Sequence, residues 1–312
     1  MPDRRERDLL VLGEANPDLI LTGRVDPAFG QAERLLDDAH LTVGGSGAIV
    51  ACAAARLGLR VSLCGIVGDD LFGHFMRDEL DRRGVDVRGL VVDPDTRTGL
   101  TTVLARPNDR AILTYEGAIG ELRAGSIDPG LLESARHVHV SSYFLQRLLA
   151  PDLPALFDGV RARGGTTSGD PNWDPAESWD GGLGDLLTRT DVFLPNATEA
   201  TRIAGVDDLD AAAGALARLA GLVVVKTGAG GALAARADRR VHAPAPSVDV
   251  VDTTGAGDAF DAGFLASWLA GDPLERALEI GAACGALSTR ALGGVDAQPT
   301  MREALALVDR DG

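Results

Sequence analysis

The second half of this chain alternates short apolar runs with helix-like segments, and this alternation limits the possible folds more than any other feature. The apolar runs are residues 138–140, 166–168, 192–194 and 222–225. The helix-like segments lie between them, near residues 154–163, 183–188 and 209–220. Apolar strands connected by helices are typical of parallel sheets that are covered on both faces. We therefore predict an α/β fold with a mainly parallel central sheet and helices on both faces.

The first half of the chain fits this pattern only in part. A strand at residues 9–13, a helix at 48–57, a strand at 61–67 and a helix at 71–82 extend it. The segments that break it are short strand candidates at 19–22 and 41–43 and a hairpin formed by 98–106 and 111–115. Because these segments do not alternate with helices, they indicate a separate small sheet packed over the functional site.

Composition argues against several classes of function. The 312 residues are enough for one large α/β domain or two small ones. A formal net charge of −16 and a pI near 4.7 argue against a general nucleic-acid binder, which needs a basic surface. Aromatic residues make up only 4% of the chain, so few side chains could stack on bases. We expect no nucleic-acid partner.

Cysteine usage and hydropathy bear on the compartment. Cys52, Cys64 and Cys284 are far apart, odd in number and without metal-site spacing. The first eight residues are charged, which does not resemble a signal peptide. Apolar runs stay shorter than the roughly 20 residues that span a bilayer. We expect a cytoplasmic protein with reduced cysteines and no membrane partner.

A glycine-rich turn at residues 251–258 opens a helix and carries the strongest functional signal. Gly255 and Gly257 allow successive backbone N–H groups to point at one spot, where the helix dipole adds positive potential. Such a helix start binds anions, most often phosphate. Asp258 places a carboxylate beside it, as phosphoryl transfer to an alcohol requires. The alternative interpretation is an ordinary helix start with a favourable acidic residue.

Two other positions combine chemistry with a turn. Asn196 and Glu199 follow a strand directly and share one side of the helix that would begin there. They could serve Mg²⁺, or Asn196 could simply cap the helix. Lys226, the only lysine in the chain, stands before Thr227 and Gly228. Its ammonium could reach a phosphate or extend into solvent.

Several motifs in the same order resemble those of the ribokinase-like, or PfkB, carbohydrate kinases. The matching segments are 43–58 (Val-Gly-Gly-Ser-Gly-Ala through Ala-Arg-Leu-Gly), 65–73 (Gly-Ile-Val-Gly-Asp-Asp-Leu-Phe-Gly), 195–200 (Pro-Asn-Ala-Thr-Glu-Ala), 226–231 (Lys-Thr-Gly-Ala-Gly-Gly) and 252–260 (Asp-Thr-Thr-Gly-Ala-Gly-Asp-Ala-Phe). The resemblance extends from about residue 10 to residue 301. It implies one kinase domain over residues 1–312 with a ribokinase-like fold. Lid segments at about 14–45 and 93–119 would be inserted in the α/β core and used for a homodimer contact.

The resemblance also implies which residues act on the acceptor. Asp258 would be the catalytic base, and the backbone of Gly255, Ala256 and Gly257 would form the anion hole. Asp261, three residues further on, is interpreted as a solvated or structural helix residue. The substrate-binding positions would be Asn16, Asp18, Gly44, Gly45 and Ile49. The family's usual Asn is replaced by Ile49, which indicates a less hydroxylated edge of the acceptor, or a ring or base.

The nucleotide side follows from the same resemblance. ATP and Mg²⁺ are the implied cofactors, with Glu199 holding the metal through water. The nucleotide-binding positions would be Asn196, Glu199, Lys226, Thr227, Gly228 and Gly230. In some members, residues that match Asp252 and Thr254 bind a monovalent cation such as K⁺; the alternative is that both only shape the turn.

The sequence thus predicts an ATP-dependent kinase for a hydroxymethyl group on a small, unphosphorylated sugar or sugar-like molecule. Asp174 stands where a basic partner for an acceptor phosphate would be expected, which argues against a phosphosugar. A nucleoside kinase of the same family and a non-catalytic sensor with this fold are the alternatives. An intact Asp258 and glycine turn argue against the sensor. A Rossmann dehydrogenase is disfavoured because the glycines at 228–231 lack the following long helix and ribose-binding acid.

Overall fold

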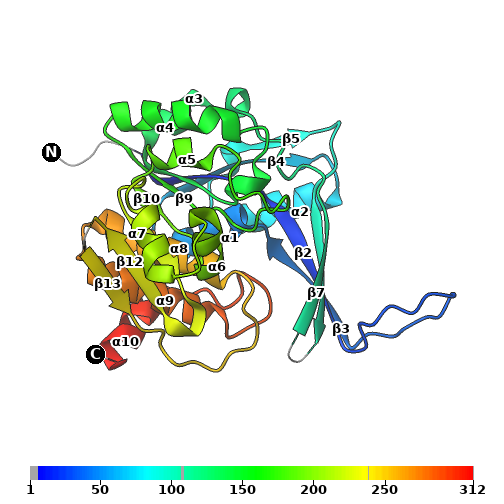
Figure 1. Ribbon diagram of the computed structural model, residues 1–312. Coiled ribbons are helices and arrows are strands. Elements are labelled where there is room, and N and C mark those ends of the chain that lie inside the picture. The colour runs from blue at the N-terminus through cyan, green and yellow to red at the C-terminus, as the bar shows by residue number, and fades with distance from the viewer. Residues whose placement is uncertain (1–5, 107–108, 238, 312) are drawn as a thin grey trace.

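The computed structural model describes residues 6–106, 109–237 and 239–311, which form two sheets and their covering helices (Figure 1). The large sheet has the order β13-β12-β11-β10-β9-β8-β1-β4-β5. Its strands are β1 (Arg7–Leu12), β4 (Val61–Gly68), β5 (Leu90–Asp93), β8 (Ala135–Val140), β9 (Thr166–Gly169), β10 (Val192–Phe193), β11 (Val223–Lys226), β12 (Ala232–Arg236) and β13 (Arg239–Ala243). Pairing is parallel from β11 to β5, and β12 and β13 add an antiparallel edge. The predicted mainly parallel sheet is confirmed.

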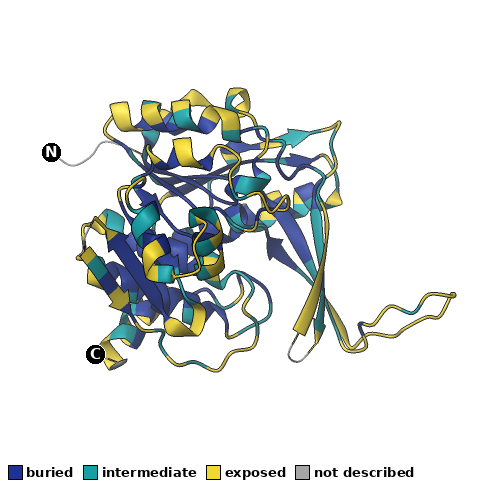
Figure 2. Ribbon diagram, viewed as in Figure 1, coloured by how far each residue is buried: buried dark blue, intermediate teal, exposed yellow. Residues whose placement is uncertain are grey.

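Helices cover both faces of the large sheet, which explains why its strands are apolar on both sides (Figure 2). One face packs against α1 (Ser46–Arg56), α2 (Leu71–Arg82), α8 (Ala256–Ala270), α9 (Leu274–Ser288) and α10 (Met301–Asp311). The other face packs against α3 (Pro129–Ser134), α4 (Leu153–Ala162), α5 (Leu183–Leu187), α6 (Ala197–Ala204) and α7 (Leu209–Leu216). Leu9 and Val11 of β1 point to the first layer, Leu10 and Leu12 to the second.

The small predicted sheet is present and stands to one side of the large one (Figure 1). It has the order β3-β2-β6-β7, with β2 (Asn16–Thr22), β3 (Asp38–Gly44), β6 (Leu100–Arg106) and β7 (Asp109–Tyr115). Two antiparallel hairpins, β2–β3 and β6–β7, join through a parallel pairing of β2 with β6. All four strands lie within the segments 14–45 and 93–119. We call this sheet the lid sheet.

The strand order places a crevice beside β1. The chain runs from β1 through α1 to β4 on one side, and β8 later joins β1 on the other side. Ligands in such sheets bind outside the carboxyl ends of the strands, where the order reverses. Here those ends lead into Gly13–Glu14 and Ser141–Ser142.

None of the helices within the described residues is both long and apolar enough to cross a bilayer. The three cysteines are free and buried in the core, and burial raises the pKa of each thiol to about 12.

Candidate active site

The glycine turn forms as predicted and depends on the absence of a side chain at Gly255. This residue is the N-cap of α8 with a φ of 71°, in the left-handed region. A Cβ at Gly255 would lie 2.7 Å from Cα of Gly294 and 3.0 Å from Ile49. Only glycine therefore fits at position 255. Because glycine has no side chain that could accept a hydrogen bond, it does not cap the first N–H groups of α8. We call residues 255–257 the anion turn; its binding of negative charge stays a prediction.

Asp258 lies in the first turn of α8. The pKa of its carboxyl is raised to about 8, chiefly by burial and also by the charges of Asp170 and Glu14. The charge of Lys226 and a hydrogen bond with Ser46 act in the opposite direction. The carboxyl thus stands beside the anion turn with its ionisation governed by four neighbours from other segments.

Lys226 ends β11 and lies between two buried carboxyl groups. Its Nζ atom donates to Asp170 Oδ2 at 2.5 Å and to Asp261 Oδ2 at 3.0 Å. Only 11% of the Lys226 side chain is exposed, and Asp261 is fully buried. The interpretation of Asp261 as solvated is therefore wrong, because α8 is covered on every side and its polar position faces the sheet. The contact of Lys226 with phosphate stays a prediction.

The pKa values of the two acids around Lys226 shift in opposite directions. Burial tends to raise the pKa of Asp170, but the Lys226 ammonium and a hydrogen bond with Asp261 hold it below its usual range. Burial raises the pKa of Asp261 well above its usual range, against the attraction of Lys226, and the charge of Asp170 adds to the rise. Asp170 is therefore the stronger acid of the pair.

Asn196 and Glu199 form a reciprocal capping box at the start of α6. Asn196 Oδ1 accepts from the Glu199 backbone N–H at 2.9 Å, and Glu199 Oε2 accepts from the Asn196 N–H at 2.8 Å. Glu199 is buried, and burial together with the charge of Asp170 raises its pKa to about 7. The capping interpretation is thus correct, and Glu199 also lies near the Lys226 cluster. Its role toward Mg²⁺ stays a prediction.

The predicted substrate-binding residues of β2 and β3 lie together. Asn16 and Asp18 are both buried. A Cβ on Gly44 would overlap Asp18 Oδ1, and one on Gly45 would lie 2.8 Å from Asn16 Oδ1. The two glycines are therefore needed to make room for these polar side chains. The sequence did not show this packing requirement. Burial raises the pKa of Asp18 to about 7, with the charge of Asp252 adding to the effect.

Ile49 is less exposed to solvent than expected for a residue that contacts the acceptor. It is 3% exposed and supports Gly255 and Gly294 from below. Its backbone carbonyl accepts from Gln298 Nε2 at 3.0 Å. Ile49 lies directly under the anion turn, and its contact with the acceptor stays a prediction.

A second group of polar residues in the crevice was missed. Glu14 Oε1 accepts from the Ser46 N–H at 2.9 Å and from Ser142 Oγ at 2.7 Å. Gln146 donates to Glu14 Oε2 at 3.1 Å, and Asn172 Nδ2 donates to Ser142 Oγ at 3.0 Å. Burial raises the pKa of Glu14 above its usual value. The signal that could have revealed this group was the presence of polar residues directly after β1 and β8, because the ends of these two strands meet at the crevice.

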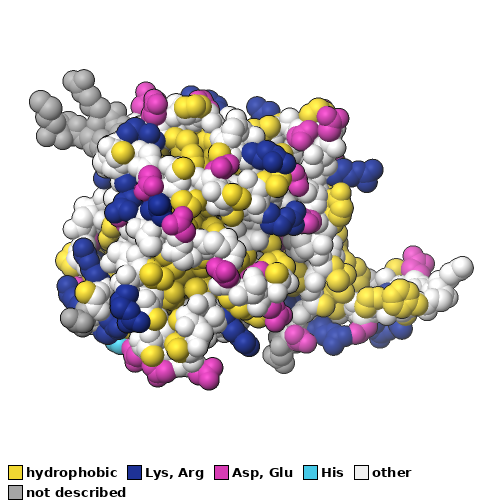
Figure 3. Space-filling view, turned by 45° about the horizontal axis from the view of Figure 1, so that its top comes forward, with side chains coloured by type: hydrophobic (Ala, Val, Ile, Leu, Met, Phe, Trp, Pro, Cys, Tyr) yellow, Lys and Arg dark blue, Asp and Glu magenta, His cyan; other side chains and the backbone are white. Residues whose placement is uncertain are grey.

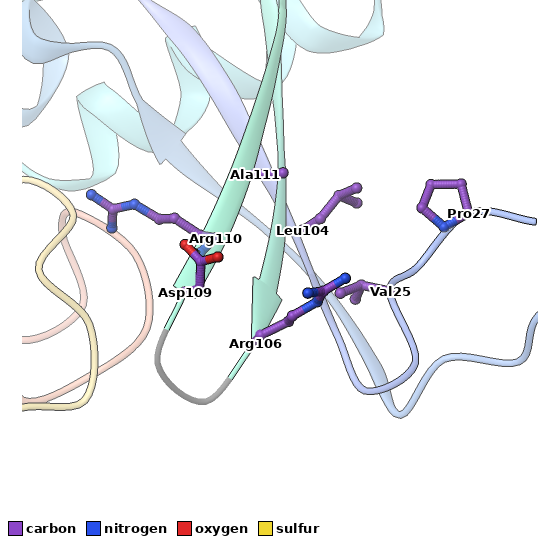
Figure 4. A pocket seen from close by; sticks show the side chains of 7 residues that line it. All are labelled: Val25, Pro27, Leu104, Arg106, Asp109, Arg110 and Ala111. Atoms are coloured by element: carbon purple, nitrogen blue, oxygen red, sulfur yellow. The ribbon is translucent and has the colours of Figure 1, made fainter.

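Arg110 connects the lid sheet to the anion turn. Its Nη1 atom donates to Asp252 Oδ1 at 3.0 Å and to Thr254 Oγ1 at 2.8 Å. Figure 4 shows Arg110 pointing toward neighbouring loops and away from Val25, Pro27 and Leu104, which line a pocket at the lid tip. Asp252 also accepts from the N–H groups of Thr254 and Gly293. Asp252 and Thr254 therefore both shape the turn, and their binding of a cation stays a prediction.

The remaining sequence candidates have structural partners. Thr227, Gly228 and Gly230 form a tight turn after β11, closed by a bond from the Thr227 N–H to the Gly231 carbonyl. Asp174 accepts from the N–H groups of Ala176, Ser178 and Trp179, and so organises its own loop. His137 and His139 of β8, which were not among the sequence candidates, both bond Ser168 Oγ.

Comparison with known proteins fits this geometry. The pfkB family carbohydrate kinase profile matches residues 6–301. An ATP-dependent ribose-1-phosphate kinase from Halopiger xanaduensis is 33% identical over 94% of this chain and 95% of its own. A fructokinase from Klebsiella pneumoniae is 33% identical over 93% of this chain and 95% of its own.

A crystal structure from E. coli, described as a ribokinase II in complex with ATP and Mg²⁺, superposes with a TM-score of 0.85. It is 27% identical and covers 97% of this chain and 99% of its own. Named kinases thus match the whole length of the molecule, lid sheet included. The chain therefore belongs to the pfkB family of carbohydrate kinases, enzymes that use ATP with Mg²⁺ to phosphorylate a sugar acceptor.

Proposed function

We propose that this enzyme transfers phosphate from ATP to a hydroxymethyl group of a small, unphosphorylated sugar or sugar-like molecule. One observation carries the proposal. Asp258 hydrogen-bonds Ser46, and Ser46 also lies against Asn172 and Glu14, so the base and the acceptor-side polar residues form one continuous site. A base at the junction of an anion turn and a polar crevice suits phosphoryl transfer to an alcohol.

Each group then has a distinct task. Asn16, Asp18 and the Glu14 cluster orient the acceptor hydroxyls through hydrogen bonds. Asp258 accepts the proton of the attacking hydroxymethyl group. The N–H groups of the anion turn stabilise the charge that develops on the transferred phosphoryl group. Arg110 holds the lid sheet against the anion turn, which limits the access of water.

The nucleotide and metal fit the residues on the opposite side of the turn. Thr227, Gly228 and Gly230 are exposed or half-buried at the end of β11, where a nucleotide can approach. Glu199 offers carboxylate oxygen, the ligand type that Mg²⁺ prefers, and this ion keeps several waters. Among the residues that the structure describes, no three acidic, histidine or cysteine side chains converge as a protein-only metal centre would require. Mg²⁺ would supply charge neutralisation for the phosphates.

The preference for an unphosphorylated acceptor rests on charge. Glu14, Asp18 and Asp258 surround the crevice, and the cations that act on them are already paired, Arg110 with Asp252 and Lys226 with Asp170 and Asp261. An acceptor phosphate would meet acidic groups, and an unpaired buried charge is strongly disfavoured. The Halopiger relative is named for a phosphorylated sugar, so the acceptor must be tested directly.

A panel of acceptors tests the proposal. ADP production with Mg-ATP is measured for ribose, fructose, ribose 1-phosphate, fructose 6-phosphate, adenosine and a deoxy sugar acid. We expect the highest kcat/KM with an unphosphorylated sugar or sugar acid other than ribose, because Ile49 replaces a hydroxyl-binding amide. Fast turnover of either phosphosugar would contradict the charge argument, and fast turnover of ribose would contradict the role given to Ile49.

A nucleoside is the second candidate acceptor because aromatic side chains gather beside Asn172. Tyr143, Phe144, Trp173 and Trp179 form a chain of edge-to-face contacts. Trp173 directly follows Asn172 and is 47% exposed, so its ring is available to a base. Adenosine as the best substrate of the panel would select this alternative.

We also propose a homodimer formed through the lid sheet. The edge strand β7 exposes Ile112, Leu113 and Tyr115, and an unpaired apolar edge invites pairing with another strand. Phe29 and Leu35 are exposed on the arm between β2 and β3, and Figure 3 shows hydrophobic side chains along this projecting arm. Sedimentation of the wild type and of Leu113→Lys checks the assignment, because a lid dimer would dissociate in the variant.

The monovalent cation proposal concerns Asp252 and Thr254. Hydrogen bonds from Gly293 and Thr254 outweigh the effect of burial and lower the pKa of Asp252, so its carboxylate is ionised and can attract a cation. Rates measured in K⁺, Na⁺ and a tetraalkylammonium salt of equal ionic strength test this proposal. Equal rates in all three would rule it out.

A further inference from the structure

The only lysine of the chain is buried against the inner side of the active site. Lys226 Nζ bonds Asp170 and Asp261, as described above, and these three residues come from three separate elements. Asp170 follows β9, Lys226 ends β11 and Asp261 lies on α8. The cluster thus joins the ends of β9 and β11, which flank β10 in the sheet, to the helix that carries Asp258.

The Lys226 side chain also lies beside the anion turn. A Cβ placed on Gly257 would lie 3.6 Å from Lys226 Nζ and 3.8 Å from its Cε. Gly257 and Asp261 are four residues apart and therefore lie on the same side of α8. Lys226 thus bonds this helix at Asp261 and faces it at Gly257, one turn earlier. Asp258 stands between these two points in the sequence.

We propose that Lys226 is a positioning residue that fixes the first two turns of α8 against the sheet through Asp170 and Asp261, and that its charge balances the carboxyl groups around Asp258. This inference rests on the proposed role of Asp258 as the base. It gives Lys226 a task that does not require contact with the nucleotide.

The charged neighbours support an effect on Asp258. The groups that face Lys226 are Asp170 beyond β9, Asp261 on α8 and Glu199 on α6, with His139 on β8 close to Asp170. Burial tends to lower the pKa of Lys226, but these three acids raise it, so the ammonium is charged throughout the working range. Without it, Asp170 and Glu14 would act on Asp258 unopposed.

The shape of the cluster explains why lysine stands in a chain that otherwise uses arginine. The ammonium is compact and donates in three directions, so it can bond two separate carboxyl groups from a narrow space. A guanidinium is larger and planar, and it presents its donors in a fixed fork that suits one carboxylate better than two separate ones.

Kinetics of Lys226→Met test the proposal, with the fastest acceptor of the panel as substrate. We expect kcat to fall by about 10- to 100-fold through loss of alignment. We expect the acidic limb of the kcat–pH profile to move up by about one pH unit, because Asp258 becomes harder to ionise. The Kd for Mg-ATP, measured by calorimetry, should change less than about threefold, since the anion hole is backbone. Arg218→Met, which removes an exposed cation from the end of α7, is the matched control and should leave all three unchanged.

A double variant covers the case in which Lys226→Met fails to fold. Asp170→Asn combined with Lys226→Met removes both opposite charges, and so leaves no unpaired carboxylate at position 170. We expect its acidic limb to return close to that of the wild type while kcat stays low, because the charge is balanced but the anchor is lost. A limb that stays shifted in the double variant would contradict the charge balance.

The outcomes separate this inference from the proposed function. Loss of turnover in Asp258→Asn with a wild-type profile in Lys226→Met would overturn the positioning role alone. Retained turnover in Asp258→Asn would overturn the base itself. A Kd for Mg-ATP that weakens more than about tenfold, with an unmoved acidic limb, would show that Lys226 binds phosphate directly and would overturn the inference.

Discussion

Asp258 and Asp261 lie one helical turn apart on α8, and yet replacing each with asparagine should have very different effects on kcat. Asp258→Asn should lower kcat by about 10²- to 10⁴-fold, because the attacking hydroxyl loses its base. Asp261→Asn should change kcat little, since an amide is close in shape to the carboxyl group and its oxygen can still accept from Lys226. Steady-state rates and calorimetric Mg-ATP affinities of both variants check the pair. Equal losses would remove Asp258 from its assigned role.

Glu199 has two tasks that two substitutions can separate. Glu199→Gln should raise the Mg²⁺ concentration for half-maximal rate by about tenfold, as loss of a group that holds metal-bound water does. Glutamine can still complete the capping box, so the variant should keep its stability. Glu199→Ala should lose both functions and about 1 kcal/mol of unfolding free energy. A Mg²⁺ titration of Glu199→Gln that superimposes on the wild type would exclude the metal role.

The limits of sequence inference are also visible at single residues. The anion turn and Asp258 were predictable because glycine spacing and a following acid are local signals. The burial of Asp261 was not, since it depends on α1, α9 and the sheet enclosing α8. The bonds of Glu14 to Ser46, Ser142 and Gln146 likewise join residues up to 132 positions apart. Pairings of this kind leave no periodic pattern in the chain.

Among the elements, the lid sheet depends on one polar contact with the anion turn. Arg110→Met should lower kcat/KM for the acceptor by about tenfold, because the charged hydrogen bonds to Asp252 and Thr254 disappear. The unfolding free energy should barely change, since the guanidinium is partly exposed. Arg106→Met is the control: Arg106 lies at the same lid tip but pairs with Asp26. If both variants behave alike, Arg110 has no special link to the turn.

Elements were predictable where one local pattern dominated. The parallel strands and the β6–β7 hairpin were found because apolar runs or alternation marked them. Strand β12 was missed because Ala232–Arg236 is rich in alanine, a weak strand former that the neighbouring strands hold in place. Helix α10 was missed although Met301, Ala304, Leu305 and Val308 recur at helical spacing and pack in the core. Tertiary packing explains only the first case.

For the whole molecule, the buried acids predict an unusual response of stability to pH. The pKa values of Asp18 and Glu199 rise to about 7 and that of Asp258 to about 8 in the folded state. The folded protein therefore binds more protons than the unfolded chain between their ordinary and raised values, so unfolding free energy falls as pH rises through this range. Burial lowers the pKa of His137 and of His139. These histidines make the unfolding free energy rise with pH, but only below about pH 6.5.

Urea unfolding of the nucleotide-free protein at about pH 6.5 and pH 8.5 checks this response. We expect a lower unfolding free energy at the higher pH, because there the acids lose their protons and the histidines no longer titrate. Glu199→Gln removes one group that titrates in this interval and should reduce the difference. Stability that rises over this interval would show that the crevice acids are ionised in the folded protein.

The parallel pairing of β2 with β6 has a consequence for the order in which the molecule assembles. Asp18 lies opposite Thr101, and the intervening chain contains α1, β4, α2 and β5. The two halves of the lid sheet can meet only after this chain has docked on β1, and such long-range closure is slow. We therefore expect the lid sheet to form last during folding and to exchange its amide hydrogens before the central strands do. Newly made chains would then pass through a stage in which the core is complete and the crevice has no cover.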